Sequence, residues 1–164
     1  MRKTLTALVS GLACLGSVLM PAAAQGAKGG NMERVEFKGI FVSQDICDFP
    51  VRIRYHSVGH IVSVETRKGT IVRAHFTEND IFTANGVSLR STTYRFNNHL
   101  RFDENGDVVS AVQTGVIVRV PLPNGETFMV AGRADFLDLV GDFVITPTNG
   151  VTKNLDDFCA ALSG

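Results

Sequence analysis

The chain has 164 residues, of which 16 are basic and 16 acidic, so its formal net charge is zero with histidine neutral. No block of basic residues stands out, which argues against nucleic acid or an anionic membrane as the main partner. The length suits one domain with its own hydrophobic core, and neither an internal repeat nor a low-complexity linker interrupts it.

Residues 1–24 are predicted to be a secretory signal peptide. A basic start is followed by an apolar run over residues 5–20 and by Pro21-Ala22-Ala23-Ala24, whose alanines suit signal peptidase. An uncleaved membrane anchor is the alternative, but the run is short and no second one supports it. Cys14 lies inside the apolar run, and the residues before it do not look like a lipid-attachment site. We therefore expect a secreted protein, extracellular or associated with the cell envelope, without a membrane span after cleavage before Gln25.

Two cysteines, Cys47 and Cys159, remain after this cleavage. Exported proteins meet an oxidising environment, so a disulfide between them is predicted. In the chain-entropy model a loop of that length contributes about 4–5 kcal/mol to stability. A reactive thiol or a metal ligand is the alternative, which no third cysteine and no fixed histidine spacing supports. We expect Cys159→Ser to destabilise the fold and to release the C-terminal segment.

A flexible leader is predicted for residues 25–33, which are rich in glycine and polar residues, and a single β domain for residues 34–164. In the first half of the domain, apolar and polar residues alternate with the period of two that is typical of half-buried strands. The predicted strands span residues 34–42, 49–56, 61–66 and 72–77. The predicted turns are residues 43–48, Ser57-Val58-Gly59 and Lys68-Gly69, and Glu78-Asn79-Asp80 breaks the pattern.

The second half continues with strand-like residues 87–96, after a turn at Asn85-Gly86. Their apolar phase shifts between Leu89 and Tyr94, which predicts a bulge. A loop is predicted at residues 103–107, and a last strand over residues 141–146.

A long hairpin is predicted over residues 108–135, around Pro123-Asn124-Gly125. In a three-residue loop Pro123 takes the second position of a type I turn, and Gly125 takes the left-handed position. This loop keeps the apolar side chains on one face, whereas a two-residue Asn-Gly turn mixes the faces. The pairs that it predicts are Val120 with Phe128, Val118 with Val130, Val116 with Gly132 and Thr114 with Ala134.

A terminal helix is predicted over residues 154–162, with Asn154 as its N-cap. Leu155, Phe158, Cys159 and Leu162 form one apolar stripe. About eight or nine short strands and one helix predict an all-β fold. Consecutive hairpins favour an antiparallel meander, and the need to avoid edge strands favours a small closed or nearly closed β-barrel. A two-sheet β-sandwich is the alternative.

Several short motifs occur in a recognisable order. They are Cys47-Asp48-Phe49-Pro50-Val51, Ala131-Gly132-Arg133 after the hairpin, and Phe158-Cys159-Ala160-Ala161-Leu162. In this order the chain resembles an uncharacterised family of short exported bacterial proteins of the actinobacterial type. The resemblance covers most of the mature chain. It implies a secreted β fold with its two cysteines paired, and it implies no activity and no site residues.

Motifs for chemistry are weak. His56 and His60, on either side of the predicted turn, could bind a metal, but no third ligand is evident, and two solvated turn residues are the favoured interpretation. His75 with Glu78 and Asp80 could form an acid–base group, or belong to an outward polar face. The acidic residues 103–107 fit no calcium-loop spacing. We therefore assign no catalytic residue, no metal site and no cofactor.

Three functions fit this sequence. The first is non-enzymatic binding of a small apolar ligand or a cell-surface component, in a barrel lined by small residues on one wall and aromatic residues on the others. The second is a barrel enzyme of the isomerase or cyclase type, which would need an inward-facing pair of polar or titratable residues. The third is a structural or partner-binding surface protein with an exposed apolar patch around Ile117, Met129 and Ala131.

Overall fold

The computed structural model describes residues 31–137 and 146–164, so the predicted signal peptide and most of the strand predicted at 141–146 lie outside the described residues. The described residues form eight strands and one helix. Their bounds are β1 Asn31–Ser43, β2 Val51–Thr66, β3 Gly69–Ala84, β4 Val87–Arg90, β5 Tyr94–Phe102, β6 Val108–Pro121, β7 Thr127–Asp135, β8 Asn149–Lys153 and α1 Leu155–Ser163. The all-β prediction is confirmed.

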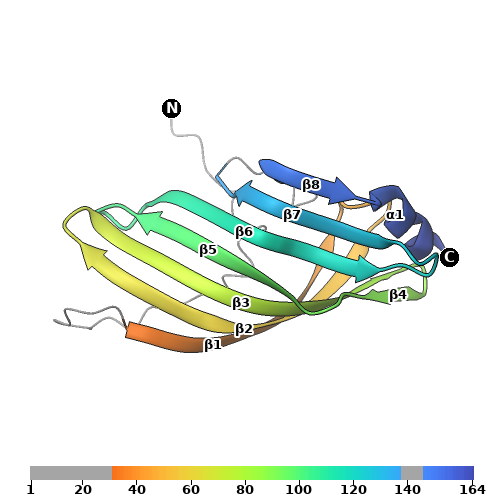
Figure 1. Cartoon of the computed structure of the whole chain (residues 1–164), viewed down its shortest axis with the longest axis horizontal. Helices are drawn as coiled ribbons and strands as arrows, with labels where there is room; N and C mark the ends of the chain where they lie inside the picture. The colour runs from red at the N-terminus through yellow and green to blue at the C-terminus, as the bar shows by residue number, and fades with distance from the viewer. Residues whose placement is uncertain (1–30, 138–145) are drawn as a thin grey trace.

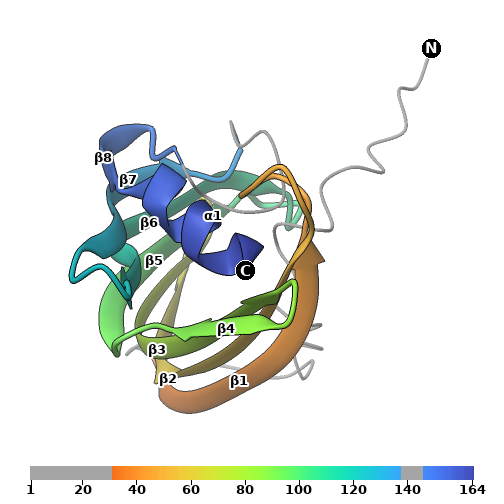
Figure 2. The same cartoon turned by 90° about the vertical axis from the view of Figure 1, so that its right-hand side faces the viewer.

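The strands form one antiparallel sheet in the order β1-β2-β3-β5-β6-β7-β8, with β4 paired to β3 (Figure 1). This order confirms the predicted meander. In the described residues the sheet is not closed, because no pairing joins β1 to β8. The sheet instead curls strongly, and α1 lies within the curve at one end (Figure 2). The sheet therefore has a concave inner face and a convex outer face.

The predicted turn at Ser57-Val58-Gly59 is wrong, because β2 runs straight through these residues. Ser57 and Gly59 continue the series of buried residues that alternates along the strand. A Cβ at Gly59 would lie 2.4 Å from the Phe76 ring and 2.2 Å from the carbonyl oxygen of His75. Glycine is therefore needed here for close packing between β2 and β3, and not for a change of direction.

The predicted hairpin loop is confirmed. The Gly125 N–H donates to the Leu122 carbonyl oxygen at 3.0 Å, and Gly125 has a φ of 90°. The pairs of Val120 with Phe128 and of Val118 with Val130 are also confirmed.

For the residues of β6 that precede Ile117, the predicted register is wrong. Val116 pairs with Ala131, and Thr114 pairs with Arg133, because Ile117 is an extra residue in β6. Such a bulge turns two consecutive side chains towards the same side. Ile117 and Val118 are accordingly both buried, with Ile117 6% exposed. The predicted exposed patch around Ile117 is therefore wrong.

The predicted bulge between Leu89 and Tyr94 is a change of strand. Residues 91–93 leave the ladder between β4 and β5. The Ser91 N–H donates to the Asp80 carbonyl oxygen at 3.0 Å, and the Thr92 N–H donates to the Arg119 carbonyl oxygen at 2.9 Å. β4 can therefore pair with β3 alone, while β5 takes its place along the rest of β3.

Helix α1 packs its predicted apolar stripe into the main core. Phe158 and Leu162 are fully buried. The Phe158 ring stacks on Phe128 with 4.3 Å between centroids and meets the edge of Phe82 at 5.3 Å. The predicted disulfide between Cys47 and Cys159 is present.

Two predictions about chain ends need correction. The side chain of Asn154 makes no N-cap hydrogen bond. It donates instead to the Thr127 carbonyl oxygen at 2.9 Å, which ties the helix start to β7. The first strand begins at Asn31 and not at residue 34, so it takes up part of the predicted leader, and the short strand β8 was not predicted.

Candidate functional site

Two carboxyl groups face the concave side of the sheet from β3. The even-numbered residues of β3 form its inward face, which includes Phe76 and Phe82. Glu78 and Asp80 lie between these two residues in the same series, so the strand is not broken here as predicted. Glu78 pairs with Ser57 on one neighbouring strand, β2, and with Tyr94 on the other, β5.

Tyr94 joins the two carboxyl groups. Its hydroxyl donates to Glu78 Oε1 at 2.8 Å and lies 2.6 Å from Asp80 Oδ2. Asp80 is 2% exposed and Tyr94 5% exposed, whereas Glu78 is only partly buried. Ser57, also buried, hydrogen-bonds to Glu78. Asp80 Oδ1 is buried and has no hydrogen-bond partner.

The backbone of Asp80 is held firmly. Its N–H donates to Ser91 Oγ at 2.7 Å, and its carbonyl oxygen accepts the Ser91 N–H. This is the point where β3 changes its neighbour from β5 to β4. The change of neighbour thus brings Ser91 to Asp80 and fixes the carboxyl group beside Tyr94.

Burial dominates the electrostatics of this group. Burial first and the nearby Glu78 charge second raise the pKa of Asp80 to about 7, although the contact with Tyr94 opposes the shift. Burial also raises the pKa of Glu78, against the hydrogen bonds from Tyr94 and Ser57. The pKa of Tyr94 lies well above its ordinary value because of burial and both carboxyl groups. At neutral pH the pair therefore resists carrying two full negative charges.

An apolar surface adjoins the carboxyl pair. Ala74, Phe76 and Phe96 are buried around Tyr94, and four partly buried side chains pack against them. These four are Val35, Phe37, Ile61 and Val116. Ring centroids are 5.8 Å apart for Phe37 and Phe76 and 5.5 Å apart for Phe76 and Phe96. The site thus combines an aromatic surface that keeps some solvent access with a pair of acids at its border.

The predicted histidine groups are not formed. His75 lies on the convex face, where its ring hydrogen-bonds to Asn97, so it cannot join Glu78 and Asp80 on the concave face. His56 and His60 lie four residues apart on one strand and flank no turn.

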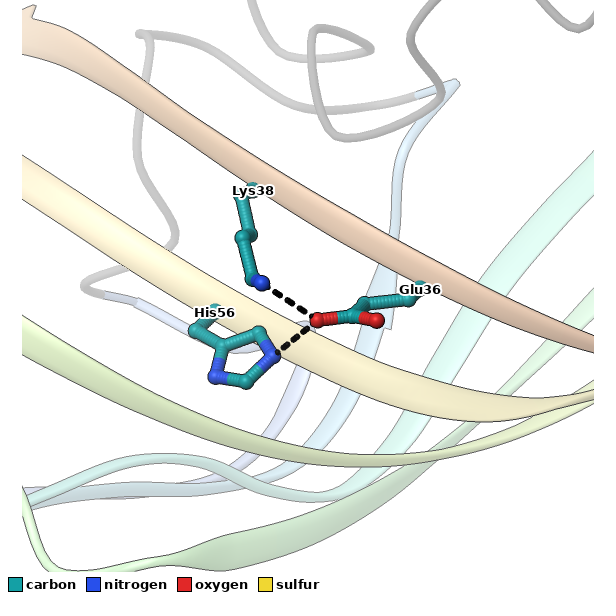
Figure 3. A network of polar contacts seen from close by, with 3 residues as sticks. All are labelled: Glu36, Lys38 and His56. Carbon is teal, nitrogen blue, oxygen red and sulfur yellow. Dashed lines mark hydrogen bonds and ion pairs between the residues drawn. The ribbon is translucent and has the colours of Figure 1, made fainter.

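His56 instead belongs to a small ionic network on the convex face, drawn in Figure 3. Its Nε2 lies 2.8 Å from Glu36 Oε1, and Lys38 contacts the same oxygen. Lys38 and His56 hold the pKa of the Glu36 carboxyl below its usual range. The three side chains are 40–65% exposed, so this network contributes little to stability.

The acidic loop at residues 103–107 is a hairpin tip. The Asp103 carboxylate accepts the backbone N–H groups of Asn105 and Asp107 at 2.8 and 2.9 Å. These backbone hydrogen bonds lower the pKa of Asp103. Within the described ranges, no group of three His, Cys, Asp or Glu residues is placed to hold a metal ion.

Sequence reasoning named Glu78 and Asp80 but grouped them with the wrong partner and missed Tyr94. The usable signal was their parity, since both share it with the apolar residues Phe76 and Phe82. Their link to Tyr94 depends on the pairing of β3 with β5, which the predicted hairpins did not contain.

Comparison with models of protein families, with curated proteins and with solved structures finds no match to this chain. Among the residues that the structure describes, no helix is long and apolar enough to cross a membrane.

Proposed function

We propose that this protein is exported and binds a small, mainly apolar molecule on the concave face of its sheet. The observation that carries the proposal is the group of four partly exposed side chains, Val35, Phe37, Ile61 and Val116, over a buried aromatic layer. The predicted signal peptide and the Cys47–Cys159 disulfide support export, because disulfides persist in oxidising compartments. The proposal includes membership of the exported family whose motifs the chain resembles.

The chemistry of the face defines the ligand class. Covering the apolar side chains removes their surface from water, which favours binding by about 25 cal/mol per Å² of apolar area. Glu78 borders this surface and is itself partly exposed to solvent. A ligand with an apolar body and one hydrogen-bond donor near Glu78 therefore fits best, as in most small-molecule sites.

Phe37 provides a test with a matched control on the same strand. Phe37 faces inward and contacts Phe76, whereas Ile40 is 54% exposed and faces outward from β1. We expect the neutral fluorescent dye Nile red to bind the mature chain, Phe37→Ala to weaken this binding several-fold, and Ile40→Ala to leave it unchanged. Native mass spectrometry of the protein from its own host's culture would then identify a retained ligand by its mass. Absence of dye binding, or equal binding by both variants, would contradict the proposal.

The alternative of a structural surface protein has less support. Its predicted patch depended on Ile117, which is buried in the core beside Val118. Met129 and Ala131 are each partly buried on β7. The patch therefore loses Ile117, although Val151, opposite Ala131 on β8, is 45% exposed.

A further inference from the structure

We infer that Asp80, Tyr94 and Glu78 form a proton relay, and that Glu78 is the acid–base group for a cofactor-independent isomerisation or cyclisation of the bound molecule. This activity goes beyond binding, and it rests on the proposed function for the presence of a substrate beside Glu78.

The count of protons comes from the two contacts of Tyr94. Its hydroxyl oxygen lies 2.8 Å from Glu78 Oε1 and 2.6 Å from Asp80 Oδ2, and both distances are those of hydrogen bonds. A phenol carries one proton and can donate only one of these bonds. With both carboxyl groups ionised, one contact would press two oxygen lone pairs together without a hydrogen atom between them. The group therefore holds a second proton on a carboxyl oxygen.

That proton belongs to Asp80. Asp80 is the more deeply buried of the two acids, and burial disfavours the ionised form. Glu78 is more exposed and receives a further hydrogen bond from Ser57, which favours its ionised form. Asp80 then donates to the Tyr94 oxygen, and the Tyr94 hydroxyl donates to Glu78. The unpartnered Asp80 Oδ1 fits this assignment, because a carbonyl oxygen loses less than a carboxylate oxygen when it is buried without a partner.

On β3, which carries the two acids, and on its neighbours β2 and β5, no cation is placed to replace the proton. None of the inward-facing residues of β2, β3 and β5 is lysine or arginine. The inward residues opposite the two acids are Ser57 and Tyr55 on β2. His56 lowers the pKa of Glu78 only through space, since it lies on the convex face. A shared proton is therefore the means by which this apolar site holds two acids.

The chain of contacts gives the relay a direction. Moving both protons one step along the chain protonates Glu78, ionises Asp80 and leaves Tyr94 neutral. No heavy atom has to move. Glu78 is the member that can contact a molecule on the concave face, so it is the catalytic residue, while Asp80 stores the proton and Tyr94 connects them.

The reaction needs no redox partner. Ionised Glu78 takes a proton from the carbon that lies between a carbonyl group and a C=C bond, and the electron pair of the C–H bond forms a new C=C bond while the carbonyl oxygen takes the negative charge. Glu78 returns the proton to the far carbon of the original C=C bond, the electron pair on the oxygen re-forms the carbonyl group, and the remaining double bond now lies next to the carbonyl. Nothing is oxidised or reduced, and every atom is retained. A small, mainly apolar carbonyl compound with a C=C bond one carbon away from the carbonyl group is the substrate class that this chemistry and this surface share.

The experiment uses the mature, disulfide-bonded chain and 5-nitrobenzisoxazole as an apolar probe of a general base. The base removes the ring C–H proton, the electron pair forms a nitrile, and the N–O bond breaks to give a coloured phenolate. We expect catalysis that Glu78→Gln reduces by about 100-fold. Glu36→Gln, which removes a carboxylate from the convex face, is the matched control and should retain the full rate.

A second readout does not depend on activity. In ¹³C spectra of the carboxyl carbons we expect one aspartate to remain protonated at about pH 6, where an ordinary carboxyl is ionised. Asp80→Asn should remove this signal, and Tyr94→Phe should separate its titration from that of Glu78. A fully ionised wild-type pair at that pH would overturn the relay, and an unchanged rate in Glu78→Gln or no catalysis by the wild type would overturn its catalytic role. Nile red binding is measured on the same samples. It reports, independently of the catalytic rate, whether each variant still folds and binds the dye.

Discussion

Removal of the disulfide should lower the stability of the whole domain without releasing its helix. The bond joins residues that are 112 positions apart, so the chain-entropy model assigns it about 5 kcal/mol. For a domain of this size, such a loss lowers the melting temperature by roughly 10–20 °C. The loss arises in the unfolded chain, so the folded state keeps its contacts. Because Phe158 and Leu162 remain buried in the main core, α1 should stay docked, contrary to our expectation from sequence.

The double variant Cys47→Ser/Cys159→Ser tests this reasoning and avoids a free thiol. Thermal unfolding followed by circular dichroism measures the change in melting temperature. Hydrogen exchange of the Phe158 N–H, which donates to the Asn154 carbonyl oxygen at 3.1 Å, reports whether α1 is docked. We expect its protection to fall only in step with that of the sheet. Complete loss of protection in α1 alone would show that the disulfide holds a loose appendage, and the reasoning would be refuted.

Three further predictions concern the core, the sheet and the carboxyl pair. Phe158→Ala removes the ring stacked on Phe128 and should cost about 3–5 kcal/mol in urea unfolding, and a loss below about 1 kcal/mol would contradict the packing. Gly59→Ala places a Cβ against the His75 carbonyl oxygen and should lower the melting temperature, which an unchanged value would disprove. Because the folded pKa of Asp80 is raised to about 7, the folded state binds more protons than the unfolded chain between about pH 4 and 7. The free energy of unfolding should therefore fall by a few kcal/mol at most as pH rises through this window. In Asp80→Asn the urea midpoint should change less with pH over the same window than it does in the wild type.

Local patterns in the sequence were enough for the fold class and several of its parts. Alternation with a period of two identified the strands, because side chains of a strand point to alternate faces whatever their partners are. Pro123 and Gly125 determined the hairpin loop, because their backbone preferences are intrinsic. The helical stripe and the disulfide were predicted for the same reason, since spacing and compartment decide them without knowledge of the neighbouring strands.

Some positions have a local sequence that fits two conformations, and there only the tertiary structure decided between them. Gly59 is compatible with a turn or with close packing, and the Phe76 ring on the neighbouring strand selects packing. The extra residue at Ile117 shifts the register only because β7 pairs on both sides of it. Glu78 and Asp80 resemble a strand break in sequence, yet they continue the inward face of β3 because Tyr94, from a strand that pairs later in the chain, meets both carboxyl groups. Cross-strand partners determine such positions, and a single strand's own residues do not specify which partner will lie beside it.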